Sequence, residues 1–177
     1  MIVLGIDPGH STGIAAYGPL GLYWARTITY GEDGAAVLEA LRLFVTTHQC
    51  WNNNRMVPDV VAVIEEPAKP YFQRQVSQRA NYRIAGNVGE CRAKAHALAG
   101  MLRALGVEVK LQAPIRGGTK RRITVPMWTA MFPEYKGRTS NHARDAAVIA
   151  QREYQRRKFL PGEIVDQRLK ERKEEGR

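Results

Sequence analysis

The first thirteen residues constrain the fold more than any other stretch of the chain. Ile2–Ile6 is a short apolar run, and Asp7 follows it directly, ahead of Pro8-Gly9. An apolar run closed by Pro-Gly predicts a buried strand with a turn behind it. Asp7 would then lie half-buried at the strand end, where a carboxylate needs a cation, a hydrogen-bond donor or a metal ion as partner. We expect Gly9 and Gly13 to let the backbone turn sharply past that partner.

Hydrophobic patterning predicts an α/β fold with a mixed sheet flanked by helices. Three strands in succession without an intervening helix predict an antiparallel meander, which argues against a purely doubly wound fold. The unbroken apolar run at 60–64 is typical of a parallel strand buried on both faces. We predict strands at Ile2–Ile6, Thr12–Tyr17, Leu22–Tyr30, Asp59–Ile64 and Val107–Ala113, a polar loop at Gln49–Pro58, and helices at Ala35–Thr47, Arg79–Leu105, Val125–Phe132 (with Trp128 in the core) and from Ser140 or Asn141 onward.

Two further acids stand at the end of the predicted fourth strand. Glu65 and Glu66 follow Val60–Ile64 in the way that Asp7 follows the first strand. Side chains alternate across a strand, so only one of the two acids can share a site with Asp7. Neighbouring strand ends lie about 4.8 Å apart, close enough for two carboxylates to hold one cation. Without a cation the pair would repel, and one carboxylate would take up a proton.

The last predicted helix brings a histidine and an acid into its first turn. Ser140 or Asn141 is a good N-cap, so His142 and Asp145 lie three residues apart on one helix face. The partial positive charge of the helix N-terminus favours an ionised Asp and a neutral His. Those are the protonation states that metal ligands need. Taken singly, each of these motifs also occurs in proteins where it is purely structural.

The net charge of +10 is distributed unevenly along the chain. As far as Ala68 there are three basic residues against seven acidic ones. Lys69–Arg103 holds seven basic residues against one acid, and Lys110–Arg144 holds eight against one. The acidic third carries the candidate site, and the basic remainder could hold a polyanion against it. This asymmetry favours a nucleic-acid partner over a merely soluble basic surface.

Two basic segments are candidates for contacts with nucleic acid. The first combines adjacent aromatic residues, suited to stacking on bases, with cations suited to phosphates, although its aromatic rings could instead fold back onto the following helix. The second places glycines beside several basic residues, as a phosphate-binding loop does. The residues concerned are Lys69, Tyr71, Phe72 and Arg74 in the first segment and Arg116, Lys120, Arg121 and Arg122 in the second.

Length and composition predict one domain over residues 1–160, followed by a charge-dense tail or helix at 161–177. No stretch approaches the roughly 18 apolar residues of a membrane span, and Asp7 interrupts the only early apolar run. We therefore expect a cytoplasmic protein that makes no membrane contact. Cys50 and Cys91 lack the spacing of a metal site or a disulfide framework, which fits a reducing compartment, and we expect both to be buried.

Three motifs in order, Ile6-Asp7-Pro8-Gly9, Ile64-Glu65-Glu66 and His142-Ala-Arg-Asp145-Ala, resemble the RuvC family of Holliday junction resolvases. The resemblance spans about Ile2–Ala150. It implies a ribonuclease-H-like fold with three antiparallel strands, then two parallel ones, and helices on both faces of the sheet. It also implies a homodimer that nicks two opposed strands of a four-way DNA junction during recombination or repair, using a divalent metal.

By matched position, the resemblance implies one set of residues as both metal ligands and catalytic residues, namely Asp7, Glu65, His142 and Asp145. In this hypothesis Asp7 bridges two ions, Glu65 holds one, and His142 with Asp145 holds the other. Glu66 stays open as the alternative to Glu65. Carboxylate oxygens suit Mg²⁺, and an imidazole ligand makes Mn²⁺ acceptable. Tyr71-Phe72-x-Arg74-Gln75 resembles the aromatic segment that family members push toward the junction centre.

The sequence departs from the family pattern in two places. The turn after Asp7 is one residue shorter than the commonest bacterial form, and the segment between the predicted fifth strand and the last helix is reduced. These departures suggest a divergent, phage-borne relative in the cytoplasm of a bacterium or an infected host. They leave open whether the substrate is the four-way junction alone or branched DNA more broadly. The lysines that the family places after its fifth strand lack a clean counterpart, with Lys120 as the candidate.

Two other classes of function were weighed against the nuclease. An ATPase of the actin or sugar-kinase type starts on a similar Asp-x-Gly loop, but it needs two further Gly-rich motifs, which we do not find. A non-catalytic nucleic-acid binder on the same fold is the other alternative. Retention of all four candidate ligands argues against it.

Overall fold

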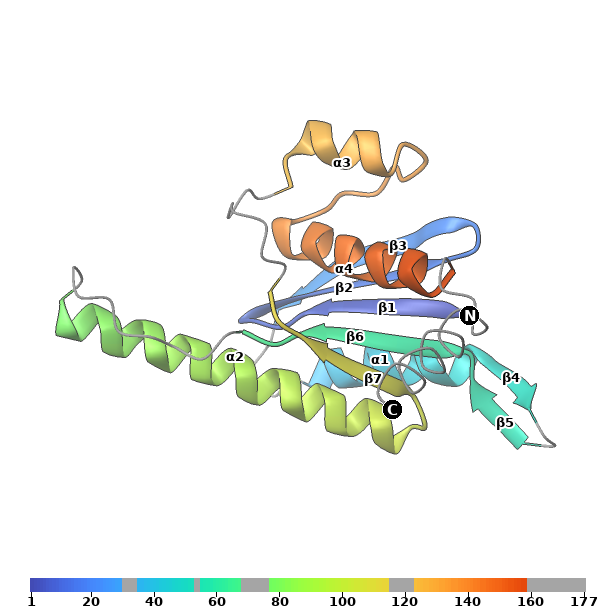
Figure 1. Ribbon diagram of the computed structural model, residues 1–177, viewed down its shortest axis with the longest axis horizontal. Helices are drawn as coiled ribbons and strands as arrows, with labels where there is room; N and C mark the ends of the chain where they lie inside the picture. Colours follow the sequence, from blue (N-terminus) through green and yellow to red (C-terminus); the bar gives the residue numbers. More distant parts are fainter. Residues whose placement is uncertain (30–34, 53–54, 68–76, 115–122, 159–177) are drawn as a thin grey trace, which may run out of the picture.

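A computed structural model describes residues 1–29, 35–52, 55–67, 77–114 and 123–158. Its centre is a five-stranded sheet in the order β3-β2-β1-β6-β7 (Figure 1). The first three strands pair antiparallel, and β6 and β7 continue the sheet parallel to β1. The predicted mixed sheet, three antiparallel strands and then two parallel ones, is confirmed. Its strands are β1 (Ile2–Asp7), β2 (Ser11–Gly18), β3 (Gly21–Thr29), β6 (Val60–Glu65) and β7 (Glu108–Gln112).

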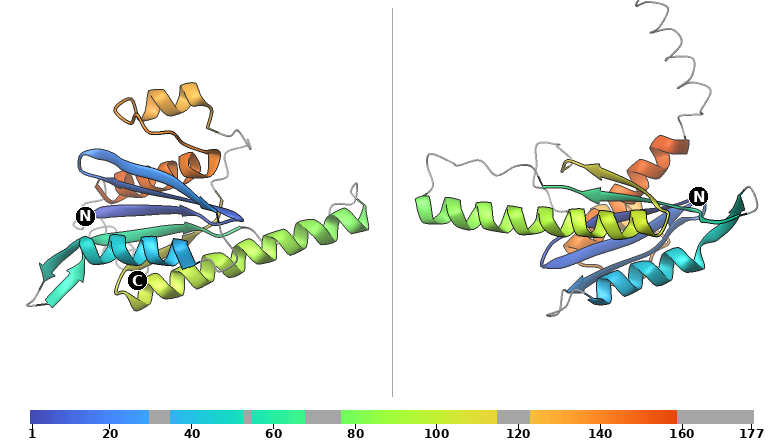
Figure 2. Two further views of the ribbon diagram at one scale, coloured as in Figure 1. Left: turned by 180° about the vertical axis from the view of Figure 1, so that it is seen from behind. Right: turned by 90° about the horizontal axis from the view of Figure 1, so that it is seen from below.

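Four helices cover the sheet, close to the predicted positions. They are α1 (Ala35–Thr47), α2 (Gln78–Ala104), α3 (Val125–Met131) and α4 (Asn141–Lys158). The first two lie on one face of the sheet, and α4 lies on the other with α3 packed above it (Figure 2). The N-terminal part of α2 extends past the strand ends (Figure 1). None of the described helices is long and apolar enough to cross a membrane.

Alternation along the central strands decides which residues face which helices. Leu4 and Ile6 on β1 and Ile64 on β6 join the core beneath α1 and α2. Val3 and Val63 lie one position before Leu4 and Ile64, so they point to the opposite face of the sheet. There they pack against Ile149 and Ala150 of α4. Both faces of β1 and β6 are therefore covered, which is why these strands read as unbroken apolar runs.

Two predictions about the periphery were wrong. Residues 49–58 form a hairpin of β4 (Gln49–Asn52) and β5 (Arg55–Pro58) instead of a loop, with Trp51 paired to Met56. The β-favouring pairs Cys50-Trp51 and Met56-Val57 carried that signal, but the polar asparagines between them obscured it. Cys91 is only partly buried. Trp128, in contrast, lies in the core at 5% exposure, as predicted.

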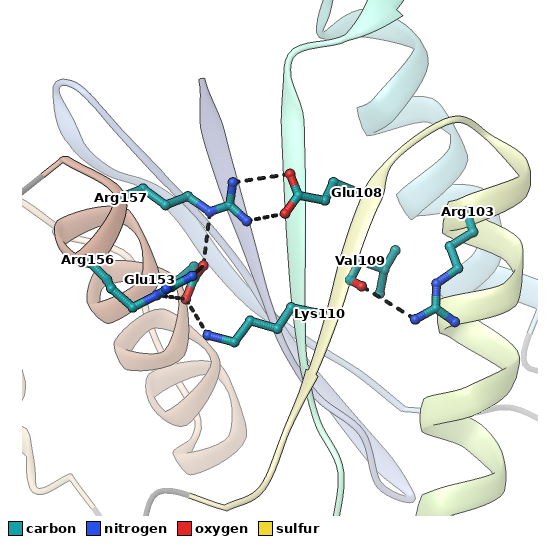
Figure 3. Close-up of polar contacts among 7 residues, drawn as sticks. All are labelled: Arg103, Glu108, Val109, Lys110, Glu153, Arg156 and Arg157. Atoms are coloured by element: carbon teal, nitrogen blue, oxygen red, sulfur yellow. Dashed lines mark hydrogen bonds and ion pairs between the residues drawn. The ribbon is translucent and has the colours of Figure 1, made fainter. Parts of the chain in front are cut away.

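The C-terminal half of α4 is fastened to β7 by a buried acid among three cations (Figure 3). Glu153 is only 2% exposed and accepts hydrogen bonds from Lys110 at 2.8 Å, Arg156 at 2.5 Å and Arg157 at 2.9 Å. Arg157 also pairs with Glu108 on β7. Burial alone would raise the pKa of Glu153, but the three hydrogen bonds outweigh it and bring the pKa to about 2. The hydrogen bonds and ion pairs of this network therefore stabilise the ionised form of Glu153.

We expect Glu153→Gln to lower the free energy of unfolding by about 2 kcal/mol at neutral pH, because it removes the buried counter-charge that three partly exposed cations share. A carboxyl whose pKa is lowered in the folded state stabilises it above the unfolded value of 4.5. The loss should therefore shrink as pH falls from 4.5 toward 2. Urea unfolding across this range measures it, with Glu108→Gln, an exposed pair member, as a control that costs under about 1 kcal/mol. Equal effects of the two variants would contradict the role given to Glu153.

Candidate metal-binding active site

Asp7 and Glu65 stand side by side at the same edge of the sheet. β1 and β6 run parallel with Ile6 opposite Ile64, so the next residue on each strand, Asp7 and Glu65, occupies equivalent places. Because Ile6 and Ile64 face α1 and α2, the two carboxylates face the side of α4. Asp7 is 17% exposed at its side chain, and Glu65 is likewise partly buried. Two acids are thereby held together in a half-desolvated position.

Glu66 points to the opposite face, where it already has cationic partners. Its carboxylate lies 2.7 Å from the guanidinium of Arg92 and 3.0 Å from Nε2 of His96, both on α2. These hydrogen bonds, that of His96 foremost, hold the pKa of Glu66 below its usual range. Of the two candidate acids, Glu65 is therefore the one that shares a face with Asp7.

α4 reaches this edge because two glycines let its backbone touch the sheet. A Cβ on Gly5 would lie 2.0 Å from the carbonyl oxygen of Ala146, and a Cβ on Gly13 would lie 2.0 Å from that of His142. Real Cβ atoms essentially never come so close, so any side chain at either position would displace the helix. The helix presents alanines to the sheet for the same reason, with Ala143, Ala146, Ala147 and Ala150 fully buried.

This close packing corrects the expectation for the first glycines. Neither Gly9 nor Gly13 is among the described glycines with positive φ, which are Gly21 and Gly106. Gly13 lies inside β2, opposite Asp7, and makes room for a helix instead of a turn. The role of Gly5 was not predicted from the sequence. A lone glycine inside an apolar strand was the available signal, since it marks close approach of another backbone.

The first turn of α4 brings a histidine onto Asp7. Ser140 caps the helix by accepting a hydrogen bond from the amide of Ala143 at 3.2 Å, and its hydroxyl also contacts that of Thr27 on β3. One residue into the helix, Nδ1 of His142 lies 2.8 Å from Oδ2 of Asp7. An ionised Asp7 can only accept, so Nδ1 carries the proton and Nε2 of a neutral His142 keeps its lone pair. The imidazole is half exposed and is therefore open to a ligand.

The electrostatics join Asp145 to the same site. Burial raises the pKa of Glu65 to about 7, and the negative charges of Asp7 and Asp145 push it in the same direction. Burial also raises the pKa of Asp7, which the hydrogen bond and charge of His142 partly offset. The charges of Asp7 and Asp145 thus add to burial in opposing the ionisation of Glu65. A bound cation is the group that would relieve this repulsion.

The donor set fits a hard divalent cation. Carboxylate oxygens with a single imidazole suit Mg²⁺ and Mn²⁺. In the part of the chain that the structure describes, no group of three or more His, Cys, Asp or Glu side chains is placed so that it could hold a metal ion. Asp7 and His142 instead contact each other directly.

The four predicted site residues are brought to one place, whereas the predicted nucleic-acid residues cannot be placed. Asp7, Glu65, His142 and Asp145 come from three elements far apart in the sequence. Lys69, Tyr71, Phe72 and Arg74, and likewise Arg116, Lys120, Arg121 and Arg122, lie outside the described residues. The predicted tail at 161–177 lies outside them as well.

Comparison of the fold with solved structures identifies its type. Thermus thermophilus RuvC in complex with Holliday junction substrate aligns with a TM-score of 0.54 at 22% sequence identity, covering 90% of this chain and 98% of that one. The chain has a RuvC-like fold. A second Thermus thermophilus RuvC structure aligns at 20% identity with a TM-score of 0.46, covering 85% of this chain and 91% of that one. No protein-family model and no curated protein matches the sequence.

The close contact between Gly13 and the backbone of α4 leads to a first test. We expect Gly13→Ala to destabilise the protein by about 3 kcal/mol, because the new methyl group meets the backbone at His142 and must push α4 away. The matched control is Gly100→Ala in α2, where a Cβ meets nothing within 4 Å. This control should instead stabilise the protein by about 0.5–1 kcal/mol, since glycine is a poor helix former. Urea unfolding of both variants decides, and a Gly13→Ala protein as stable as the parent would refute the contact.

The crowded carboxylates lead to a second test. A carboxyl whose pKa is raised on folding takes up protons, so stability falls as pH rises from 4.5 toward 7. A shift of this size corresponds to about 3.4 kcal/mol, which solvent screening of the partly exposed Glu65 reduces to about 1–2 kcal/mol. Without metal, Glu65→Gln should match the parent near pH 4, below the unfolded pKa of 4.5, and be more stable by that amount at pH 8. Unfolding free energies measured across this range check it, and a pH-independent difference would contradict the assigned cause.

Proposed function

We propose that the protein is a metal-dependent endodeoxyribonuclease that nicks branched DNA, with the Holliday junction as its principal substrate. The observation that carries the proposal is the meeting of Asp7, Glu65, His142 and Asp145 at one strand edge of a RuvC-like fold. The positive charge of the chain outside its first third supports a polyanionic partner. We place this activity in DNA recombination or repair in the cytoplasm of a bacterium or an infected host.

In this proposal Asp7, at the centre of the set, would be a shared ligand of Mg²⁺. Glu65 would contribute from the neighbouring strand, and His142 with Asp145 would contribute from α4. Mg²⁺ held there would supply a water nucleophile and stabilise the departing 3′ oxygen. The raised pKa of Glu65 means that metal and proton compete for its carboxylate near neutral pH. We expect Mn²⁺ to replace Mg²⁺ because the set includes an imidazole.

A homodimer completes the proposal. A four-way junction has two-fold symmetry, and two paired nicks need two sites related by the same symmetry. One chain carries one such set of acids, so two copies would supply both sites. The RuvC in the aligned complex is bound to Holliday junction substrate, which makes branched DNA the first substrate class to test.

The test is cleavage of a synthetic four-way junction with Mg²⁺. We expect Asp7→Asn to lower the single-turnover rate by about 10²–10³-fold, because a metal site supplies several kcal/mol and each 1.36 kcal/mol is tenfold. Glu66→Gln is the matched control, since it alters the adjacent carboxylate on the other face of the sheet and should keep most of the activity. Unchanged activity of Asp7→Asn, or equal losses in the two variants, would refute the assignment. Duplex, flap and Y-shaped substrates separate a junction resolvase from a broader branched-DNA nuclease.

The main rival is a DNA-binding protein of the same fold without catalysis. The absence of a closed three-residue metal group among the described residues is the observation in its favour. Calorimetric titration of Mg²⁺ and Mn²⁺ distinguishes the two, because the nuclease binds metal through Asp7 and the rival does not. DNA binding without metal uptake or cleavage would establish the rival.

A further inference from the structure

A shallow pocket of about 500 Å³ lies on the flank of α4 away from the candidate active site. α3 forms one wall with Trp128, and the segment that returns from α3 to α4 forms the other with Tyr135. The two rings meet edge to face, with centroids 5.6 Å apart. Lys136, Arg138 and Arg144 complete the cationic part of the lining. The function proposed above makes no use of this pocket.

The pocket gathers positive charge that the described protein does not neutralise. Its lining residues include three cations and no acid. Arg144 donates only to neutral oxygens, those of Ile123 and Thr139, at 3.0–3.2 Å. Lys136 contacts only the carbonyl of Pro133 at 2.9 Å, and the exposed Arg138 makes no hydrogen bond or ion pair within the described residues. An uncompensated cluster of this kind is suited to a phosphate group.

The segment that carries these cations is held in place. The hydroxyl of Tyr135 donates to the carbonyl of Ala25 at 3.0 Å and lies 3.3 Å from the amide of the same residue, on β3. A Cβ on Gly137 would lie 2.5 Å from that hydroxyl, so the ring folds tightly over this glycine. Two hydrogen bonds from Arg144, to the hydroxyl and the carbonyl of Thr139, fix the other end of the segment. Lys136 and Arg138 therefore project from a braced backbone, and binding would cost little ordering of the main chain.

The pocket is close to the candidate active site along the chain. Thr139, in its lining, precedes His142 by three residues, which an extended chain spans in at most about 11 Å. One strand of duplex DNA advances about 3.4 Å per nucleotide. A strand whose scissile phosphate lay at Asp7 and His142 would thus reach the pocket within a few nucleotides.

We propose that this pocket binds a backbone phosphate of the substrate DNA within a few nucleotides of the cut, with Arg138 and Lys136 as the residues that contact it. The proposal rests on the proposed function for the position of the cut, but the binding itself needs no metal and no cleavage. The contact fixes the position of the DNA strand without reading its sequence.

The first measurement is the affinity for a four-way junction in metal-free buffer, by fluorescence anisotropy over a range of salt concentrations. We expect Arg138→Ala to weaken binding about tenfold at low salt and to reduce the slope of log K against log salt by about 0.9, the value for one lost phosphate contact. Arg103→Ala is the matched control, because Arg103 is an exposed arginine at the far end of α2. It should leave the slope unchanged.

The second measurement places the contact on the DNA. Neutral methylphosphonate linkages are introduced singly around the cut position of the junction. One or more linkages within a few nucleotides of the cut should weaken binding by the parent protein and have no further effect on Arg138→Ala. A slope for Arg138→Ala equal to that of Arg103→Ala, additive effects of linkage and variant, or no binding by the parent would each overturn the proposal. Expected binding results from a parent that does not cleave would uphold the pocket and refute the nuclease.

Discussion

Contact between the backbone of α4 and the backbones of β1 and β2 is the constraint on which the rest of the structure depends. Gly5 and Gly13 leave no atom in the way, and the alanines of α4 let the helix settle onto them. At this separation His142 reaches Asp7, and Asp145 comes near enough to raise the pKa of Glu65. A helix held a methyl group farther from the sheet would keep the same topology and lose that convergence. The convergence of these side chains depends on the distance between α4 and the sheet, and packing of glycines and alanines sets that distance.

The two ends of α4 make opposite electrostatic contributions. At its N-terminus, partly buried carboxylates crowd together and raise the pKa of Glu65, which costs stability at neutral pH. At its C-terminal half, Glu153 is surrounded by three cations and its pKa falls to about 2, which holds the helix against β7. The ion pairs of Glu153 thus offset the carboxylate repulsion at the other end of the same helix, where the proposed cation would bind. Active sites commonly carry strain that the surrounding structure compensates.

Much of the fold follows from patterns that the sequence displays directly. Unbroken apolar runs predict β1 and β6, because a strand buried on both faces has apolar residues at successive positions. Apolar residues at helical spacing predict α1, because a helix buried on one face has them only along that face. The hairpin at 49–58 escaped this reasoning, since strands of four residues are too short to show a period. Sequence patterns also could not decide between Glu65 and Glu66. Alternation shows that the two acids face opposite ways, but only the packing of α4 shows which face holds Asp7 and which holds Arg92.

One helix also separates the acidic groups from the basic ones. Asp145, in the first turn of α4, joins the acids near Glu65, while the next residue before it, Arg144, lines a pocket whose charged residues are all basic. If the protein acts on DNA as proposed, a cluster of carboxylates alone would repel the phosphate at the cut. Opposite charges at 4 Å attract by about 4 kcal/mol near a protein surface, and this attraction weakens as the separation grows. In the proposal, cations that line a separate pocket attract the DNA backbone without pairing with the carboxylates that would hold the metal. Separating attraction of the strand from binding of the ion would let each be strong, and Arg144 links the two because it lies on α4 beside Asp145 and donates to Thr139 in the pocket.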